Sequence, residues 1–416
     1  MGKGTYGVVY KARHKRTQQL LAIKKIIDAF QNLIDAKRTY RELNYLLQLS
    51  HPNIIRLERV LPLTRKEQSR LPNTSRLAVA LPCHEEQRGS TTDKLLPDPT
   101  AQRHLYAVFE LMDTDLSRVL RQCSGMQAIQ RKYIAYQLML GVCYLHQSGL
   151  IHRDIKPSNL LVNCETLETK LCDFGMARLK NQKAVEDGVL TEYVASRWYR
   201  PPEILLGINS CQEGIDLWSA GCVIAELILR QPIFPGKNTL DQLELIFKAI
   251  GMPEPKEVSQ LQCESAQLVI NNFTFSKRCK YRSLQDTLSM AEAPELDLIQ
   301  RLLQFNPSNR LSAREALAHP YFNEVRDRFG GSNFEPAHIA EHPFPSDKSI
   351  APSVDHYRMR VGELEKYGGR STNRSLPVIH QPNRYESSNQ EELDKEKSTK
   401  ESGEVLLMKN NLGDKQ

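Results

Sequence analysis

The sequence predicts an α+β fold, and three features of the 416-residue chain lead to this prediction. Residues 1–61 begin with the alternation of apolar and polar side chains that is typical of strands. They also include a helical stretch, LIDAKRTYRELNYLLQL, in which Leu43, Leu46 and Leu47 form an apolar stripe at helical spacing. Residues 104–330 are dense in apolar periodicity, as a large folded core requires. Strands and helices thus share one chain, in which we find no internal repeat.

Polar segments interrupt and follow these folded regions. Residues 62–103 are rich in Pro, Ser, Thr and charged side chains, and we expect a long loop or a disordered insert there. From about residue 370 the chain is dominated by Ser, Asn, Glu and Lys, which predicts a disordered tail. Before that tail, SVDHYRMRVGELEKYGG predicts one more helix, capped by Ser353 and stopped by Gly368 and Gly369.

The composition excludes several classes of protein. The chain is 40% hydrophobic and 25% charged, and its net charge of +7 is too diffuse to indicate a nucleic-acid partner. It has no apolar run long enough to cross a bilayer and no apolar signal core near its start. The nine cysteines include no CxxC pair, which favours reduced thiols over a zinc site or a disulfide framework. We therefore expect a cytoplasmic or nuclear protein with no membrane and no nucleic-acid partner.

The chain opens on a glycine-rich motif that can cradle phosphates. In MGKGTYGVVYKA, Gly2, Gly4, Gly7 and Val9 spell G-x-G-x-x-G-x-V, which alone is weak evidence because a glycine-rich terminus would look the same. A phosphate loop needs a cation, and LAIKK supplies Lys24 on a strand-like segment. Glu42, in the helical stretch that follows, is suited to orient that lysine as an ion pair.

The most specific signal is LIHRDIKPSNLLV followed by KLCDFGMAR. Phosphoryl transfer depends on positioning and charge neutralisation. Asp154 can accept the proton of a substrate hydroxyl, and Lys156 can lie against the transferred γ-phosphate. Asn159 and Asp173 are hard oxygen ligands of the kind that Mg²⁺ prefers. The alternative, in which the two aspartates only stabilise turns, does not account for the glycine motif and the lysine that precede them.

With these motifs in place, the sequence resembles a eukaryotic protein kinase from Gly2 to about Arg310. Finer features are similar to the mitogen-activated protein kinases. They are the segment LTEYVASRWYRPPEILL with Thr191-Glu192-Tyr193, the late insertion GMPEPKEVSQLQCESAQLVINNFTFSKRCKYRSL, and the hinge-like sequence ELMDTDL. A cyclin-dependent-like kinase is the second interpretation, because a phenylalanine at position 109 is also common there.

The resemblance implies a two-lobed fold. The expected parts are a small lobe over 1–108, with an antiparallel sheet and one helix, a hinge over 109–112, and a mainly helical large lobe over 113–330. A C-terminal extension with a helix over 331–369 and the tail over 370–416 follow. In the family a strand precedes the glycine loop, so we expect a chain whose first strand is missing through N-terminal shortening. The 62–103 insert, between two small-lobe strands, is either a lineage-specific loop or an unspliced intron.

The resemblance also implies a site for ATP and Mg²⁺. Phe109 corresponds to the gatekeeper, and the backbones of Glu110 and Met112 are expected to bind the adenine edge, whatever side chains they carry. Cys172 faces the nucleotide in this family, and we interpret it as a packing residue. The expected nucleotide-binding residues are Gly2, Gly4, Gly7, Val9, Ala22, Lys24, Phe109, Glu110, Met112, Leu161 and Cys172.

Three further positions have structural roles by resemblance. Asp216 is expected to brace the backbone of the catalytic loop from a buried helix. Glu203 and Arg310 are expected to form a buried pair that ties the activation segment to the large lobe. In the family an acidic docking patch follows AHPYF, but here Arg326 and Arg328 flank Asp327, so docking of basic peptides is left open.

Regulation follows from the same resemblance. Thr191 and Tyr193 are expected to be phosphorylated by an upstream dual-specificity kinase or by autophosphorylation, and phosphatases would reverse this. The expected phosphate-binding residues are Arg41, Arg153 and Arg178 for Thr191, and Arg197 and Arg200 for Tyr193. Substrates are expected to be proteins with Ser-Pro or Thr-Pro sites, because proline leaves no N–H unsatisfied in the neighbouring pocket. The alternative from another class is a kinase-fold scaffold with weak or no activity.

Overall fold

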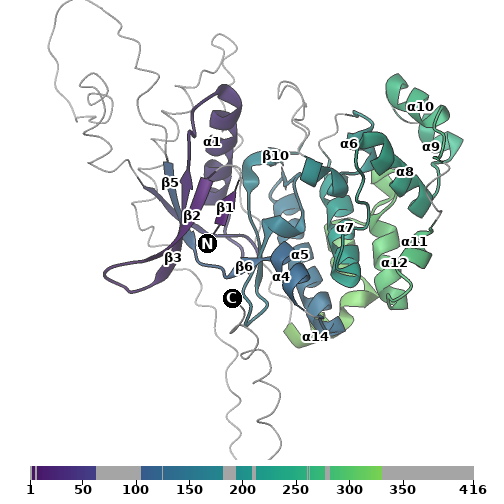
Figure 1. Cartoon of the computed structure of the whole chain (residues 1–416). Helices are drawn as coiled ribbons and strands as arrows, with labels where there is room; N and C mark the ends of the chain where they lie inside the picture. Colours follow the sequence, from purple (N-terminus) through teal and green to yellow (C-terminus); the bar gives the residue numbers. More distant parts are fainter. Residues whose placement is uncertain are drawn as a thin grey trace, which may run out of the picture. The chain divides into compact units, whose positions relative to one another are not determined.

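The computed structural model describes residues 2–4, 7–61, 105–123, 125–180, 194–208, 212–259, 261, 263–276 and 282–329 (Figure 1). All of them belong to a compact unit that spans Met1–Arg370. The insert at 62–103, the helix expected near 353–369, the tail and the two expected phosphorylation sites Thr191 and Tyr193 lie outside the described residues.

The first described part is an antiparallel sheet with strand order β1-β2-β3-β5-β4. Its strands are β1 Gly2–Gly4, β2 Gly7–Arg13, β3 Leu20–Ile26, β4 Leu57–Leu61 and β5 Leu105–Glu110. The glycine-rich motif therefore enters the sheet through β1 and β2, and β1 contributes three residues to it. Because β4 and β5 are hydrogen-bonded neighbours, the segment between them in the sequence connects two adjacent strands of this sheet.

Strand register places the nucleotide-face residues together. Val9 lies opposite Lys24, and Ala22 lies opposite Phe109. Because directly opposed residues and residues two apart share one face of a sheet, all four side chains belong to the same face. Gly7 is required in β2 because a Cβ there would stand 2.0 Å from the carbonyl oxygen of Lys25.

Among the described residues of this part, a long helix accompanies the sheet, as the apolar stripe predicts. Helix α1 spans Leu33–Gln48, and the side chain of its N-cap residue Asn32 accepts a hydrogen bond from the Asp35 backbone N–H at 2.9 Å. Leu43 and Leu46 are buried in the core. Figure 1 shows α1 beside the sheet, in the purple part of the chain. The predicted α+β class is thus confirmed.

The second part is mainly helical. Between the hinge and residue 180, short strands alternate with two α-helices and two 3-10 turns. These elements are β6 Thr114–Asp115, α4 Leu116–Gln122, α5 Ala128–Gln147, β7 Leu150–Ile151, η1 Pro157–Asn159, β8 Leu160–Val162, β9 Thr169–Leu171, η2 Phe174–Met176 and β10 Arg178–Leu179.

Helix α7 forms the centre of the remaining helical region. Nearly all of its side chains are buried, including Trp218, because its sequence GIDLWSAGCVIAELIL is apolar on every face. The late insertion carries α9 and α10. The elements of this region are η3 Val194–Tyr199, α6 Pro202–Leu205, α7 Gly214–Leu229, α8 Thr239–Ile250, α9 Pro255–Ser259, α10 Glu264–Asn271, α11 Leu284–Thr287, α12 Ala293–Leu302, η4 Pro307–Asn309, α13 Ala313–Ala318, η5 Pro320–Phe322 and α14 Asn323–Phe329.

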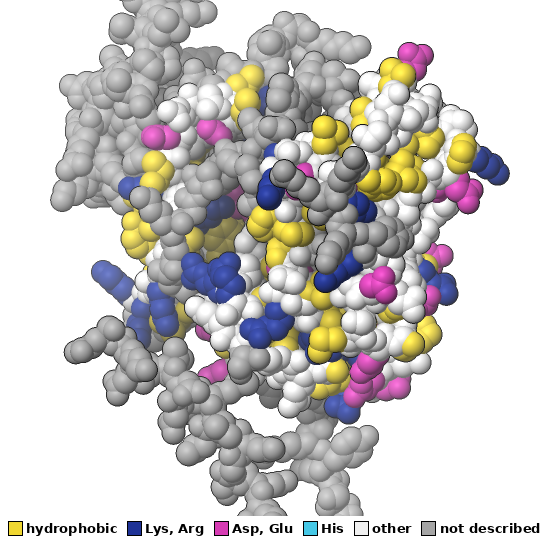
Figure 2. Space-filling model, turned by 45° about the vertical axis from the view of Figure 1, so that its right-hand side comes forward, with side chains coloured by type: hydrophobic (Ala, Val, Ile, Leu, Met, Phe, Trp, Pro, Cys, Tyr) yellow, Lys and Arg dark blue, Asp and Glu magenta, His cyan; other side chains and the backbone are white. Residues whose placement is uncertain are grey.

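The surface carries charges of both signs. On the face shown in Figure 2, basic, acidic and hydrophobic side chains are interspersed. Within the described ranges, no helix is both long and apolar enough to cross a membrane.

Candidate active site

The first pair of the site joins the sheet to α1. The Lys24 Nζ atom lies 2.6 Å from Glu42 Oε1, so the ion pair expected between them is present. Burial opposes the charged ammonium, but the negative charges of Glu42 and Asp173 outweigh it and raise the pKa of Lys24 above its ordinary value. Lys24 is therefore a fixed positive charge at neutral pH, on the face that carries Val9.

Helix α7 holds the backbone of the catalytic loop, which follows β7 and carries Asp154. The Asp216 carboxylate accepts hydrogen bonds from the backbone N–H groups of His152 and Arg153, both at 2.8 Å, and lies 3.0 Å from His146 Nε2. Arg153 has φ of +66°, a strained value for a residue with a side chain, and these bonds hold it there. Burial alone would raise the pKa of Asp216, but its bonds to His146 and to the loop lower it below the ordinary value. The predicted bracing role of Asp216 is thus confirmed.

Within that loop, Asp154 is oriented by two neighbours. Its Oδ2 atom accepts hydrogen bonds from Lys156 Nζ at 2.7 Å and from Asn159 Nδ2 at 2.9 Å. Asn159 Nδ2 also donates to the Asp154 backbone carbonyl at 2.9 Å, so its amide nitrogen is committed to the loop. In this orientation, the Asn159 side chain keeps its carbonyl oxygen as the group available to a cation.

Asp173 lies two residues after the end of β9 and is the N-cap residue of η2, with φ of +66°. Burial raises its pKa, but the positive charges of Lys24 and Lys156 prevail and lower it below the ordinary value, so the carboxylate is ionised. The next residue, Phe174, is fully buried and meets the His152 ring edge-on at 4.9 Å between ring centroids. Asp173 is thus anchored beside Lys24 by the packing of its neighbour.

The donor set suits a cation shared with phosphates. No group of three or more His, Cys, Asp or Glu side chains in the described part of the chain could hold a metal by itself. Asp173 and Asn159 offer one carboxylate and one amide oxygen. Mg²⁺ is commonly bound by one or two carboxylates together with substrate phosphates and water. The residues present therefore fit a Mg²⁺ ion that arrives with a nucleotide.

The apolar residues of the expected nucleotide site lie in the protein core or pack against it. Ala22, Phe109 and Met112 are 9% exposed or less, and Leu161 on β8 packs against the same core. Cys172 is partly buried, and lost hydration raises the pKa of its thiol above the ordinary value, which favours a packing role. The nucleotide contacts of these residues stay predictions, as do those of Gly2 and Gly4.

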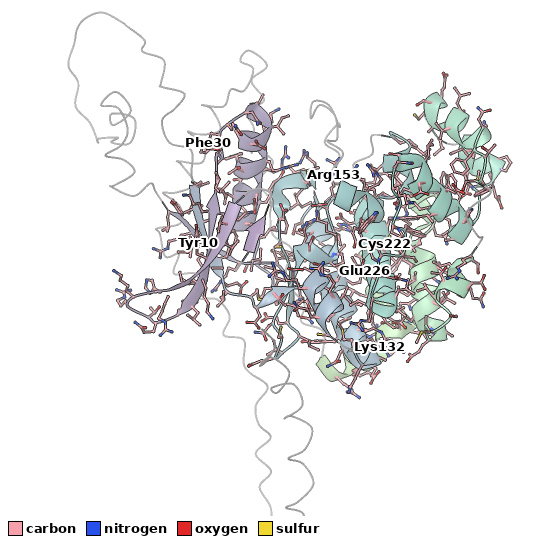
Figure 3. All side chains as sticks on the ribbon, in the orientation of Figure 1. Tyr10, Phe30, Lys132, Arg153, Cys222 and Glu226 are labelled. Atoms are coloured by element: carbon pink, nitrogen blue, oxygen red, sulfur yellow. The ribbon has the colours of Figure 1, made fainter. Side chains whose placement is uncertain are left out.

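Of the three arginines expected to bind phosphorylated Thr191, two contact the backbone of residues 175–177, and the third lies close to the strand that pairs with β10. Arg41 Nη1 donates to the Gly175 carbonyl at 3.0 Å, and Arg178 Nη1 donates to the carbonyls of Met176 and Ala177 at 3.0 and 2.8 Å. β10 pairs with β7 through Arg178 and Ile151, two residues before Arg153, which Figure 3 labels. The side chains of Arg41 and Arg178 thus hold the backbone that follows Asp173, a use that the sequence did not indicate.

The two arginines expected to bind phosphorylated Tyr193, Arg197 and Arg200, differ in their burial. Arg197 is 5% exposed, and its Nη1 atom donates to the Lys237 carbonyl at 3.1 Å, so it supports the loop before α8. Arg200 is half-buried. The nearby Glu203 and Arg310 form the predicted buried pair, with two parallel contacts of 2.7 Å, which confirms that prediction.

Comparison with known proteins agrees with this geometry. The model of the protein kinase domain matches residues 1–322. Extracellular signal-regulated kinase 2 of Dictyostelium discoideum is 40% identical over 331 residues, which cover 79% of each chain. Mitogen-activated protein kinase 5 of Oryza sativa subsp. indica is 37% identical over 79% of this chain and 78% of its own length. Mitogen-activated protein kinase 15 of Xenopus laevis is 38% identical over 88% of this chain, which spans 55% of that relative. The chain therefore belongs to the protein kinase family, among its mitogen-activated protein kinases.

Proposed function

We propose that Asp154 is the catalytic base of this protein serine/threonine kinase and that Lys24, Lys156, Asn159 and Asp173 complete its site. The observation that supports this most is the position of the Asp154 carboxylate, which accepts hydrogen bonds from both Lys156 and Asn159. A base held in this way can accept the proton of a Ser or Thr hydroxyl without first reorganising.

The substrates are ATP and a protein hydroxyl. Lys24, oriented by Glu42, neutralises charge on the α- and β-phosphates, and Lys156 neutralises charge on the γ-phosphate during transfer. Val9, Ala22, Leu161 and the hinge backbone hold the adenine. Asp173 and Asn159 hold Mg²⁺, which supplies charge neutralisation and orientation of the phosphates.

The activity is regulated at the activation segment. Phosphorylation of Thr191 would add about two negative charges and strong acceptors, for which Arg41, Arg153 and Arg178 are the expected partners. Arg41 and Arg178 already hold the backbone of residues 175–177, so a phosphate bound there would fix that backbone further. For phosphorylated Tyr193, Arg197 and Arg200 are the expected partners, and Arg197 already donates a hydrogen bond to the Lys237 carbonyl.

Partners follow from this regulation. An upstream dual-specificity mitogen-activated protein kinase kinase, or autophosphorylation, adds the phosphates, and phosphatases remove them. Protein substrates carry Ser-Pro or Thr-Pro sites. A peptide library in which proline after the phosphorylated residue confers no advantage over alanine would contradict this specificity.

The decisive experiment compares Asp154→Asn with the wild-type protein after phosphorylation by an activating kinase. The asparagine keeps the shape of the side chain but cannot accept the proton, so kcat should fall by about 10²- to 10⁴-fold while the melting temperature changes little. Asp286→Asn, an exposed capping residue of α11, is the matched control and should keep full kcat. Normal kcat in Asp154→Asn would exclude this assignment, and an inactive wild-type protein with Mg-ATP would support the scaffold alternative.

A further inference from the structure

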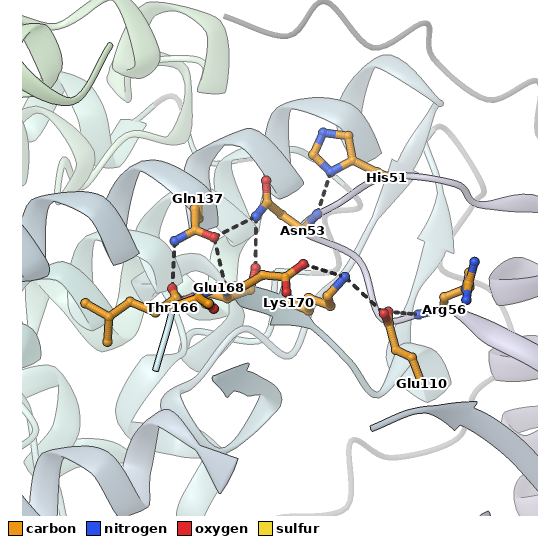
Figure 4. Close-up of polar contacts among 10 residues, drawn as sticks. His51, Asn53, Arg56, Glu110, Gln137, Thr166, Glu168 and Lys170 are labelled. Carbon is orange, nitrogen blue, oxygen red and sulfur yellow. Dashed lines mark hydrogen bonds and ion pairs between the residues drawn. The ribbon is translucent and has the colours of Figure 1, made fainter. Parts of the chain in front are cut away.

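A network of polar side chains lies behind the hinge and connects four segments of the chain. They are the linker 51–56 between α1 and β4, the hinge residue Glu110, helix α5 and strand β9. Figure 4 shows these contacts. Asn53 and Gln137, at its centre, are 5% and 4% exposed, so their polar groups depend on one another for hydrogen bonds.

The linker is tied to β9 through its backbone and through Asn53. Leu171 N–H donates to the Asn53 carbonyl at 2.8 Å, and Ile55 N–H donates to the Leu171 carbonyl at 2.9 Å. Asn53 Nδ2 donates to Gln137 Oε1 at 3.1 Å and to the Thr169 carbonyl at 2.9 Å. The segment that connects α1 to β4 is therefore fixed to the strand that leads directly into Asp173.

Glu110 joins the hinge to this network through its side chain. Its Oε1 atom accepts a hydrogen bond from the Arg56 backbone N–H at 2.8 Å, and its Oε2 atom lies 3.2 Å from Lys170 Nζ. Lys170, on β9, also lies 2.9 Å from Glu168 Oε1, and its side chain is 8% exposed. A single carboxylate therefore links the linker and the hinge to a nearly buried cation three residues before Asp173.

We propose that Glu110 and Lys170 are positioning residues, whose ion pair fixes the hinge backbone relative to β9. This inference rests on the proposed function, in which the backbone of Glu110 binds adenine and Asp173 binds Mg²⁺. The pair would then set the spacing between the two ends of the bound nucleotide. The sequence suggested no role for the Glu110 side chain, because only the backbone contacts adenine.

An opposite role can be distinguished from this one. A bond across the hinge could instead restrain the lobes and lower activity. The structure favours positioning, because the Lys24–Glu42 ion pair is formed at 2.6 Å while the Glu110–Lys170 pair is also formed. The contact is therefore compatible with the arrangement that binds phosphates.

The test uses Lys170→Met and Glu110→Gln in the whole chain. Each removes one charge of the pair with little change in volume. We expect the Kd for a non-hydrolysable ATP analogue with Mg²⁺, measured by calorimetry, to rise about threefold or more, and KM for ATP to rise in parallel, while kcat stays within about twofold. Lys170→Arg keeps the positive charge and should therefore bind the ATP analogue with nearly the affinity of the wild type.

The matched control is Lys248→Met. Lys248 is as buried as Lys170 and forms an ion pair with Glu244 at 2.7 Å within α8, away from the hinge. It should lower the melting temperature without changing nucleotide affinity. If Lys170→Met does not fold, Glu110→Gln carries the test alone.

Two outcomes would overturn the proposal. The first is an unchanged Kd for the ATP analogue in both Lys170→Met and Glu110→Gln. The second is a rise in kcat/KM above that of the wild type, which would show that the ion pair restrains the lobes. A wild-type protein that binds the analogue normally but transfers no phosphate would contradict the proposed function, and the binding measurement would still decide the role of the pair.

Discussion

Removing Glu203 should destabilise the large lobe strongly, because it leaves Arg310 buried without its counter-charge. The Arg310 side chain is fully buried and the Glu203 side chain is 5% exposed, and two 2.7 Å contacts join them. Breaking a buried pair of this kind costs about 3–5 kcal/mol. Arg310 keeps hydrogen bonds to the carbonyls of Gln304, Phe305 and Gly214, so we expect the lower end, about 3 kcal/mol, for Glu203→Ala.

The assay is thermal unfolding at a fixed scan rate. A loss of about 3 kcal/mol should lower the melting temperature by roughly 4 °C. The control is Arg301→Ala, which removes an exposed pair with Asp297 and should shift it by about 1 °C. The double variant Glu203→Leu/Arg310→Met should recover part of the loss, because no buried charge remains. A shift in Glu203→Ala no larger than in Arg301→Ala would refute this reasoning.

Two further predictions concern the small lobe and the linker. Gly7→Ala places a Cβ 2.0 Å from the Lys25 carbonyl oxygen, so β2 must move, and KM for ATP should rise severalfold in steady-state assays; an unchanged KM would show that β2 does not set the nucleotide site. Burial, with Lys170 nearby, lowers the pKa of His51 to about 4, so folding favours the neutral ring. The stability from this shift is complete above about pH 6.5 and falls as the pH drops towards 4, by about 3 kcal/mol at most. In urea unfolding, the free energy of unfolding of His51→Gln should therefore fall less between pH 7 and 4.5 than that of the wild type. Equal losses would contradict a lowered pKa for His51 as the cause.

Local patterns in the sequence predict much of this structure. The apolar stripe of Leu43 and Leu46 predicts α1 to within one residue at its end, because burial of one helix face repeats every three to four residues. The motifs predict the ion pair Lys24–Glu42, the family resemblance implies the pair Glu203–Arg310, and both are present. Such pairs are accessible to sequence reasoning because each partner lies in a short, distinctive motif.

The polar network behind the hinge could not be predicted in the same way. Asn53 and Gln137 are 84 residues apart, and nothing in their local sequence distinguishes them from exposed polar residues. Their partnership exists only after the linker, α5 and β9 have packed together. Arg197 shows the same limit, since its bond to the Lys237 carbonyl depends on the path of a loop 40 residues away.

Helix α7 has a consequence for the order in which parts of the molecule open. It is buried on nearly all faces, Asp216 holds the amides of His152 and Arg153, and Glu226 accepts a hydrogen bond from Tyr199 at 2.7 Å. Local opening starts where few buried contacts must be broken, and amides bonded to the deepest element exchange with deuterium last. The catalytic loop should therefore share the slow exchange of α7, while the exposed hairpin between β2 and β3 exchanges within the first time points. If the sheet unfolds partially, the loop that carries Asp154 should therefore keep its structure, and the sheet can refold onto it.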